Sequence, residues 1–367
     1  MQYTLLNSPM FNQQQLLFTP GPVPISESVQ DAMLDLVYHK HEGFANVHQE
    51  VMSHLQTIIG TDGPILIAPG SGTTGAEIFM RGLVPFQSNV LVLVQGRFSS
   101  RWAELGRMFG HNVMTLKSAW GEYNSLESLQ QVLREHHFHS IWITHTETST
   151  TITVPLKEYC EIIHACSPET LIIVDAVSSI GIEQFNMKGY GIDCVFTASQ
   201  KGLAAPPGAT IMALSNRATE KAKYYSEESM IFPTMVHNLP GLIHASQQHL
   251  PYFTPPLPII AALHASCKHI VESKTHFEDL SIQARNIKQS ISKINGCDVI
   301  GNAIGVTAVK HDFAPRIRTS MYEHGIIIAP GQDEWASSVF RIGHMVSYSP
   351  NDIQRLTKTI TMICESL

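Results

Sequence analysis

The sequence lacks the features that bring a protein into a membrane or onto a nucleic acid. No segment of its 367 residues approaches the length of apolar chain needed to cross a bilayer, and the N-terminus has no basic region followed by an apolar stretch. The 24 lysines and arginines are spread without runs and are outnumbered by acidic residues, which gives a net charge of -7. We therefore expect neither nucleic acid nor a membrane as a partner, and small-molecule chemistry in the cytoplasm.

Closely spaced cysteines are also missing. This absence argues against both a zinc site and a disulfide framework, so we expect reduced thiols and no bound metal. The six cysteines form no CxxC pair and are Cys160, Cys166, Cys194, Cys267, Cys297 and Cys364.

Apolar residues, by contrast, are numerous enough to fill a large core. They make up 44% of the chain, and at this length two domains are expected. From about residue 60 to 215, short apolar runs alternate with segments of helical spacing, which is the pattern of parallel strands joined by crossover helices. The runs are apolar throughout, as is typical of strands covered on both faces. The strands predicted here are Pro64–Ala68, Val90–Val94, Ile141–Thr144, Leu171–Val174, Cys194–Thr197 and Thr210–Leu214.

A proline-rich stretch separates this region from the C-terminal part. Between about residues 216 and 260 the alternation of strands and helices fails. Beyond it, two helical stretches precede strands expected at Val306–Val309, Gly325–Ala329 and Val339–Ile342, and a last helix from about Asp352. The sequence thus predicts an N-terminal extension over residues 1–17, a large α/β domain with a doubly wound sheet over 18–260, and a smaller α+β domain over 261–367.

A glycine-rich turn, Pro69-Gly70-Ser71-Gly72-Thr73-Thr74-Gly75, follows the first predicted strand and leads into a helix. Backbone N–H groups and hydroxyls at a helix N-terminus bind phosphate well. The turn lacks the Gly-Lys-Ser/Thr ending of a P-loop and does not fit the dinucleotide-binding fingerprint. By itself it leaves two interpretations open, phosphate binding and a simple reversal of the chain.

Two more of the predicted strands lead into residues that suit chemistry. Asp175 directly follows the run Leu171–Val174, at the strand end where open α/β sheets bind ligands. Its carboxylate either caps the next turn through Ser178 or Ser179, or pairs with a cation such as a protonated ring nitrogen. Lys201 follows another strand and precedes small apolar residues. It is either a solvated loop residue or an amine with a lowered pKa.

A phosphate cup, an acid and a lysine are together what pyridoxal phosphate requires of a protein. Here the chain resembles the class V aminotransferases of fold type I, in particular the group that uses alanine or serine as amino donor and glyoxylate or pyruvate as acceptor. The resemblance implies a large pyridoxal-phosphate-binding domain with a mainly parallel seven-stranded sheet flanked by helices, and a smaller C-terminal α+β domain. The matching stretches are Phe18–Pro22, Gly70–Thr73, Thr144–Thr150, Val174–Ser179, Ser199–Leu203, Pro206–Gly208 and Phe340–Gly343.

The resemblance also assigns roles at the cofactor. Lys201 would form the internal aldimine and move the catalytic proton, and Asp175 would keep the pyridine nitrogen protonated. Val177 and Phe98 would pack on the two faces of the ring, and Thr148 would approach the phenolic oxygen. The implied phosphate ligands are Ser71, Gly72, Thr73 and Gln200, together with Thr254 from the opposite subunit of a homodimer whose active site lies at the interface.

Arg341 would bind the substrate carboxylate through its bidentate fork, although an arginine in a strand also serves as a structural ion-pair partner. Gly21 would lie near the substrate, although the Pro-Gly-Pro sequence in which it stands is also typical of an ordinary tight turn. The chain departs from the family pattern at Thr151, where many relatives carry glycine, and at His41-Glu42-Gly43, which matches only loosely. Both departures bear on the substrate more than on the cofactor.

The predicted function is therefore ping-pong transamination between alanine or serine and glyoxylate or pyruvate. A 2-aminoethylphosphonate:pyruvate transaminase is the alternative. A cysteine desulfurase fits less well, because the loop Pro330–Ser338 contains no cysteine and Gln200 stands where those enzymes usually have histidine. A non-enzymatic interaction role is disfavoured because the lysine, the aspartate, the phosphate loop and the arginine are all retained.

Overall fold

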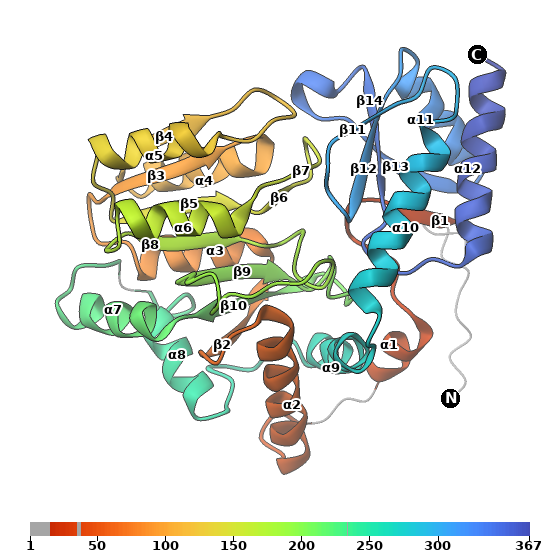
Figure 1. Ribbon diagram of the computed structural model, residues 1–367. Helices are drawn as coiled ribbons and strands as arrows, with labels where there is room; N and C mark the ends of the chain where they lie inside the picture. The colour runs from red at the N-terminus through yellow and green to blue at the C-terminus, as the bar shows by residue number, and fades with distance from the viewer. Residues whose placement is uncertain (1–14, 35–37, 233) are drawn as a thin grey trace.

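Two β-sheets organise the chain, and the computed structural model describes them through residues 15–34, 38–232 and 234–367 (Figure 1). The first fourteen residues of the predicted N-terminal extension lie outside the described residues. The larger sheet has the strand order β2-β10-β9-β8-β5-β3-β4. Its strands are β2 (Ile65–Gly70), β3 (Asn89–Val94), β4 (Asn112–Lys117), β5 (Ser140–Thr144), β8 (Leu171–Asp175), β9 (Cys194–Ala198) and β10 (Gly208–Leu214).

Six strands of this sheet run in the same direction. Strand β10 is antiparallel to both of its neighbours, β2 and β9, and the other neighbouring strands pair in parallel. The mainly parallel seven-stranded sheet expected from the resemblance is therefore confirmed. Its geometry places the carboxyl ends of β2, β3, β5, β8 and β9 at one edge.

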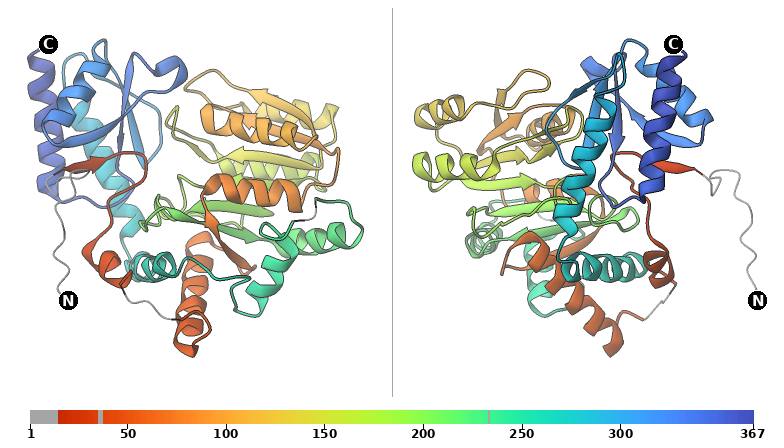
Figure 2. Two further views of the ribbon diagram at one scale, coloured as in Figure 1. Left: turned by 180° about the vertical axis from the view of Figure 1, so that it is seen from behind. Right: turned by 45° about the vertical axis from the view of Figure 1, so that its right-hand side comes forward.

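Helices cover both faces of the large sheet (Figures 1 and 2). Along β3, Leu91 and Leu93 belong to the core on one face, whereas Val90 and Val92 belong to the core on the other. This double burial explains why the strands are apolar throughout. The first core includes residues of α2 (Glu42–Ile59), α5 (Leu126–Glu135), α6 (Leu156–Cys166) and α9 (Leu257–Glu272). The second includes residues of α3 (Gly72–Gly82), α4 (Arg97–Met108), α7 (Asn216–Glu227) and α8 (Leu239–Gln247).

The smaller sheet has the order β1-β13-β14-β12-β11, and a third core joins it to its own helices. Neighbouring strands of this sheet are antiparallel, with the exception of β1 and β13, which pair in parallel. Its elements are β1 (Leu16–Phe18), α10 (His276–Ile291), β11 (Asp298–Ile300), β12 (Val306–Lys310), α11 (Ala314–Glu323), β13 (Ile326–Pro330), β14 (Val339–Gly343) and α12 (Pro350–Glu365). The remaining elements are the short helix α1 (Glu27–Ala32), the 3-10 helix η1 (Asp333–Trp335) and the two-stranded ribbon of β6 (Thr146–Glu147) and β7 (Ile152–Thr153).

The predicted domain limits can be compared with these cores. The predicted limit between residues 17 and 18 falls inside β1. This strand pairs with β13 of the small sheet, and the chain enters the large domain only after it. The limit at 261 falls inside α9, whose Ile260, Leu263 and Cys267 all belong to a core of the large sheet. The change from one core to the other therefore comes between α9 and α10. Among the described residues, no helix has the length and apolar character required to cross a membrane.

Candidate active site

A cavity of about 290 Å³ opens at the carboxyl edge of the large sheet. It gathers residues from the ends of several strands and from the turn at Gly21, so segments far apart in the sequence meet there. The predicted site residues that line it are Gly21, Ser71, Gly72, Thr73, Phe98, Thr148, Asp175, Val177, Gln200 and Lys201. Arg341 and Thr254, which were predicted with them, are not among its lining residues.

One end of the cavity is formed by the turn from β2 into α3. Ser71 is the N-cap of α3, and its backbone N–H donates to Thr74 Oγ1 over 3.1 Å. The first turn of a helix leaves N–H groups without intrahelical acceptors, which suits an anion. Gly72 is required here, because a Cβ atom would lie 2.5 Å from Val177 Cγ2. Gln200 lines the cavity beside this turn, and the NH2 group of its amide is the end that can donate to an anion.

Asp175 lies at the end of β8 and is 5% exposed. Its Oδ1 accepts from Val177 N–H over 3.0 Å, and its Oδ2 accepts from Trp102 Nε1 over 3.0 Å. The side chain thus does hold the next turn, but through Val177 rather than Ser178 or Ser179. Burial raises the pKa of Asp175 to about 7. Since no basic side chain of the described residues lies within salt-bridge distance, the carboxylate lacks the cation that a protonated ring nitrogen would supply.

Lys201 follows β9 and packs against the N-terminal turn. Its Nζ donates to the carbonyl of Pro20, and Gly21 lies so close that a Cβ there would be 2.4 Å from Lys201 Cδ. Burial, with a further contribution from the Arg341 charge, lowers the pKa of Lys201 to about 8. The ammonium is therefore destabilised, which favours the reactive amine over a solvated loop lysine.

Arg341 lies in β14 of the small sheet and is 4% exposed. Its Nε donates to Pro330 O over 2.8 Å and its Nη1 to Thr148 O over 2.6 Å. No carboxylate of the described residues lies within 4.0 Å of it, so the interpretation as a structural ion-pair arginine finds no partner. Burial lowers the pKa of Arg341 to about 10. This guanidinium is oriented by carbonyl oxygens but not neutralised.

The sequence profile of the family described as Aminotransferase class-V matches residues 26–351. The chain belongs to this family. It is 31% identical to alanine–glyoxylate aminotransferase 1 of Saccharomyces cerevisiae, over 90% of this chain and 91% of that protein. It is 26% identical to serine–glyoxylate aminotransferase of Methylorubrum extorquens, over 90% and 86%. The crystal structure of alanine–glyoxylate aminotransferase from Nostoc sp. superimposes with a TM-score of 0.88 at 25% identity, over 98% and 97%.

This class V aminotransferase is a pyridoxal-phosphate-dependent transaminase of fold type I. The site fits that cofactor on its own evidence. A buried acid without a cation, a lysine with a lowered pKa and the N-terminus of helix α3 are the groups that the cofactor's ring nitrogen, aldehyde and phosphate require.

Several residues of the site were not predicted from the sequence. Helix α4 places Arg101 and Trp102 on the cavity together with Phe98, which was predicted. Both residues could have been inferred from the sequence, because they follow Phe98 by three and four positions and so share its face of the helix. Glu147 had no such signal. It is completely buried and accepts from Ser99 N–H over 2.8 Å and from Ser149 Oγ over 2.6 Å. It thereby joins the start of α4 to the segment that carries Thr148.

The two departures from the family pattern lie in different surroundings. Thr151 is buried with a φ of 53°, a conformation that suits glycine and is strained for a β-branched residue. Its Oγ1 donates to Ile300 O over 3.2 Å. His41 is exposed and is the N-cap of α2, where its Nδ1 accepts from Gly43 N–H over 3.0 Å. Neither residue lines the cavity.

Proposed function

We propose that this enzyme transfers amino groups between alanine or serine and glyoxylate or pyruvate, in a ping-pong cycle that depends on Lys201. The observation that carries the proposal is Arg341, a buried guanidinium without a carboxylate partner among the described residues, whose charge contributes to the lowered pKa of Lys201. A substrate carboxylate would supply that partner. The activities for which the two relatives reported above are named, alanine–glyoxylate and serine–glyoxylate aminotransferase, support the substrate class. They do not favour the aminoethylphosphonate alternative.

Each residue has a role in the proposal. Bound pyridoxal phosphate supplies an electron-withdrawing ring that stabilises negative charge at the substrate α-carbon. Asp175 would hold the ring nitrogen in its protonated form, and the first turn of α3 with Gln200 would hold the phosphate. Val177 and Phe98 would confine the ring from either side. Lys201 would attach the cofactor through its amine and carry the proton to and from the α-carbon.

A homodimer is part of the proposal because Thr254 is exposed and lies outside the cavity. It would reach a cofactor phosphate only from another copy of the chain. Exposed apolar residues flank it in the sequence: Met235 is 82% exposed, Val236 57% and Leu250 54%. Leu34 is a further example, at 80%. The proposed interface takes in these apolar side chains, since burial against a second copy would remove them from water.

A spectroscopic titration tests the reaction. Purified enzyme with cofactor should lose its imine absorbance when alanine or serine is added, and regain it with glyoxylate or pyruvate. Initial rates at several fixed donor concentrations should give the parallel double-reciprocal lines of a ping-pong mechanism, and Lys201→Ala should show no imine band. Conversion by aminoethylphosphonate but by neither amino acid would overturn the substrate assignment.

Alaninamide, which lacks the carboxylate, tests Arg341 separately. The native enzyme should prefer alanine to alaninamide strongly. Arg341→Met should lose about 1.5–3 kcal/mol of transition-state stabilisation with alanine, as for a hydrogen bond to a charged group, and little with alaninamide. An equal loss with both substrates would mean that Arg341 is structural.

A further inference from the structure

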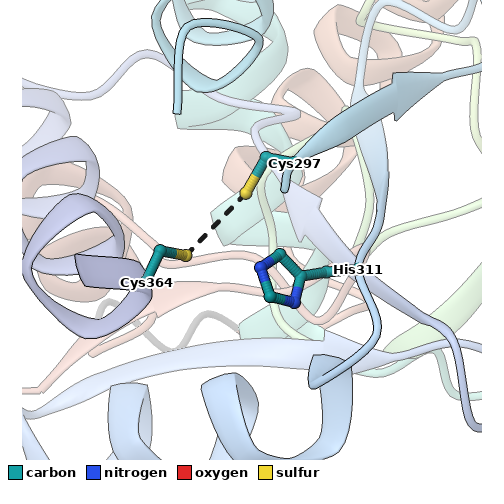
Figure 3. Close-up of side chains that lie close together, drawn as sticks. All are labelled: Cys297, His311 and Cys364. Atoms are coloured by element: carbon teal, nitrogen blue, oxygen red, sulfur yellow. Dashed lines mark hydrogen bonds between the residues drawn. The ribbon is translucent and has the colours of Figure 1, made fainter. Parts of the chain in front are cut away.

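Two cysteines that are 67 residues apart in sequence meet at the surface of the small domain (Figure 3). Cys297 lies between α10 and β11, and Cys364 lies in the last turn of α12. Their Sγ atoms are 3.9 Å apart. Cys297 is 9% exposed and Cys364 is partly exposed, so Cys364 is the more accessible of the two to molecules in solution. The sequence gives no sign of this contact, because the fold brings together residues that no local spacing connects.

His311 completes the cluster, and one ring nitrogen lies within 4.8 Å of both sulfur atoms. A Cβ on Gly296, the residue before Cys297, would be 2.8 Å from His311 Nε2, so this nitrogen faces the cysteines (Figure 3). The other nitrogen, Nδ1, accepts from Phe313 N–H over 3.0 Å. A neutral imidazole that accepts at Nδ1 carries its proton on Nε2. His311 therefore presents an N–H donor to the sulfurs.

This tautomer distinguishes two uses of the cluster. A histidine that binds metal through Nε2 needs a free lone pair there, and its Nδ1 usually donates a hydrogen bond. Here Nδ1 accepts one instead, which disfavours a thiophilic metal. An N–H donor beside two thiols stabilises a thiolate, the form that reacts with disulfides. The hydrogen bond between the thiols lowers the pKa of Cys364 and raises that of Cys297.

We propose that Cys297 and Cys364 form a reversible disulfide, with His311 stabilising the attacking thiolate. The oxidant is a small disulfide such as oxidised glutathione. The Cys364 thiolate attacks one of its sulfur atoms, breaks the S–S bond and releases one glutathione thiolate. Cys297 then loses its proton and attacks Cys364 Sγ, which releases the second glutathione thiolate. Two electrons pass from the protein thiols to glutathione, and the two thiol protons go to the glutathione thiolates or to solvent.

The bond would join the end of α12 to the sheet that it covers. Cys297 belongs to the core of the small domain, and Cys364 packs against that core together with Ile360 and Ile363 of the same helix. Cys364 lies in the last turn of α12, and helix ends open readily. A covalent link there would suppress this opening. None of Cys297, His311 and Cys364 lines the cavity, so we expect the effect on stability rather than on the reaction.

The experiment compares the native enzyme with cofactor before and after incubation with oxidised glutathione. We expect two of the six thiols to be lost and one proteolytic fragment pair that joins Cys297 to Cys364. The melting temperature should rise, and dithiothreitol should reverse both changes. Cys297→Ser and Cys364→Ser should each abolish the rise. Cys166→Ser, at a partly exposed thiol of α6, is the matched control and should keep it.

His311→Phe tests the histidine. It should slow thiol loss at neutral pH at least several-fold while leaving the cross-link attainable at high pH, where the thiolate forms unaided. Three results would overturn the proposal: six thiols that survive oxidation, a glutathione adduct on Cys364 that never resolves into the cross-link, or stoichiometric zinc retained by native protein and lost from Cys297→Ser. The last would make the cluster a metal site.

Discussion

At Lys201 the effects of burial and of the Arg341 charge outweigh that of the Asp175 carboxylate, and the lowered pKa that results predicts how the reactivity of this amine depends on pH. With a pKa of about 8, the amine is mostly protonated at pH 6 and mostly neutral at pH 9. Only the neutral amine attacks an aldehyde. The rate at which cofactor-free enzyme takes up pyridoxal phosphate should therefore rise about tenfold per unit below pH 8 and level off above it.

Arg341→Met provides the control for this profile. Removing the positive charge should move the midpoint upward, because the Arg341 charge is the second cause of the lowered pKa of Lys201 after burial. The profile is measured from the initial rate of imine absorbance between pH 6 and 10.5. A rate that keeps rising to pH 10 in the native enzyme would show that Lys201 is solvated.

A second prediction compares alanine substitutions at Gly21 and Gly110. Both have positive φ, 92° and 76°, but a Cβ at Gly21 would collide with Lys201 whereas nothing lies within 4 Å of one at Gly110. Each alanine substitution should cost about 1 kcal/mol of folding stability through backbone strain. Only Gly21→Ala should also displace Lys201 and reduce cofactor attachment by at least about tenfold, which corresponds to roughly 1.4 kcal/mol. Urea unfolding and imine absorbance separate the two effects, and equal absorbance in both variants would contradict the assignment.

Among the secondary-structure elements, the ribbon of β6 and β7 connects the two sheets through Asn302. The Asn302 side chain accepts from Thr153 N–H over 2.7 Å and donates to Thr153 O over 2.9 Å. The carbonyl of Thr151 accepts from the backbone N–H groups of Asn302 and Ala303. These bonds explain how the strained Thr151 is held in place. The same ribbon carries Thr148, whose carbonyl orients Arg341, so its position controls the carboxylate site.

Asn302→Ala should therefore affect substrate binding as well as stability. Two lost hydrogen bonds should cost about 1–3 kcal/mol of unfolding free energy. KM for the amino acid should rise while cofactor attachment at Lys201 is kept. Asn112→Ala is the matched control, since Asn112 Nδ2 also makes two hydrogen bonds, to Gln87 O and Asn89 Oδ1, but at the far edge strand β4. If both variants changed KM alike, the ribbon would have no special role.

For the molecule as a whole, the features predicted from the sequence are those that leave a local pattern of residues, such as buried strands. Contacts between residues far apart in the chain could not be predicted. The central strands were predicted because burial on both faces makes them apolar throughout. Strand β4 was missed because its edge position leaves it partly exposed, with polar residues such as Asn112 and Thr115 interrupting the apolar ones. Ten of the twelve predicted site residues line one cavity, since strand ends converge there. The contact between Trp102 and Asp175, 73 residues apart, and the meeting of Cys297 with Cys364 leave no local signal.

The proposed dimer leads to a prediction about a single exposed methionine. Met235 is 82% exposed and lies near Thr254 in the chain, whereas Met108 is 81% exposed at the end of α4. An aspartate in place of either loses few contacts within one chain, so both variants should fold. At a buried interface, however, an unpaired carboxylate costs several kcal/mol.

Met235→Asp should therefore shift the sedimentation coefficient toward the monomer and weaken cofactor retention, because Thr254 would be withdrawn from the partner's site. Met108→Asp should remain dimeric and fully loaded. Equal sedimentation of both variants with the native enzyme would place the interface on another surface, whereas a native monomer with full activity would remove Thr254 from the site.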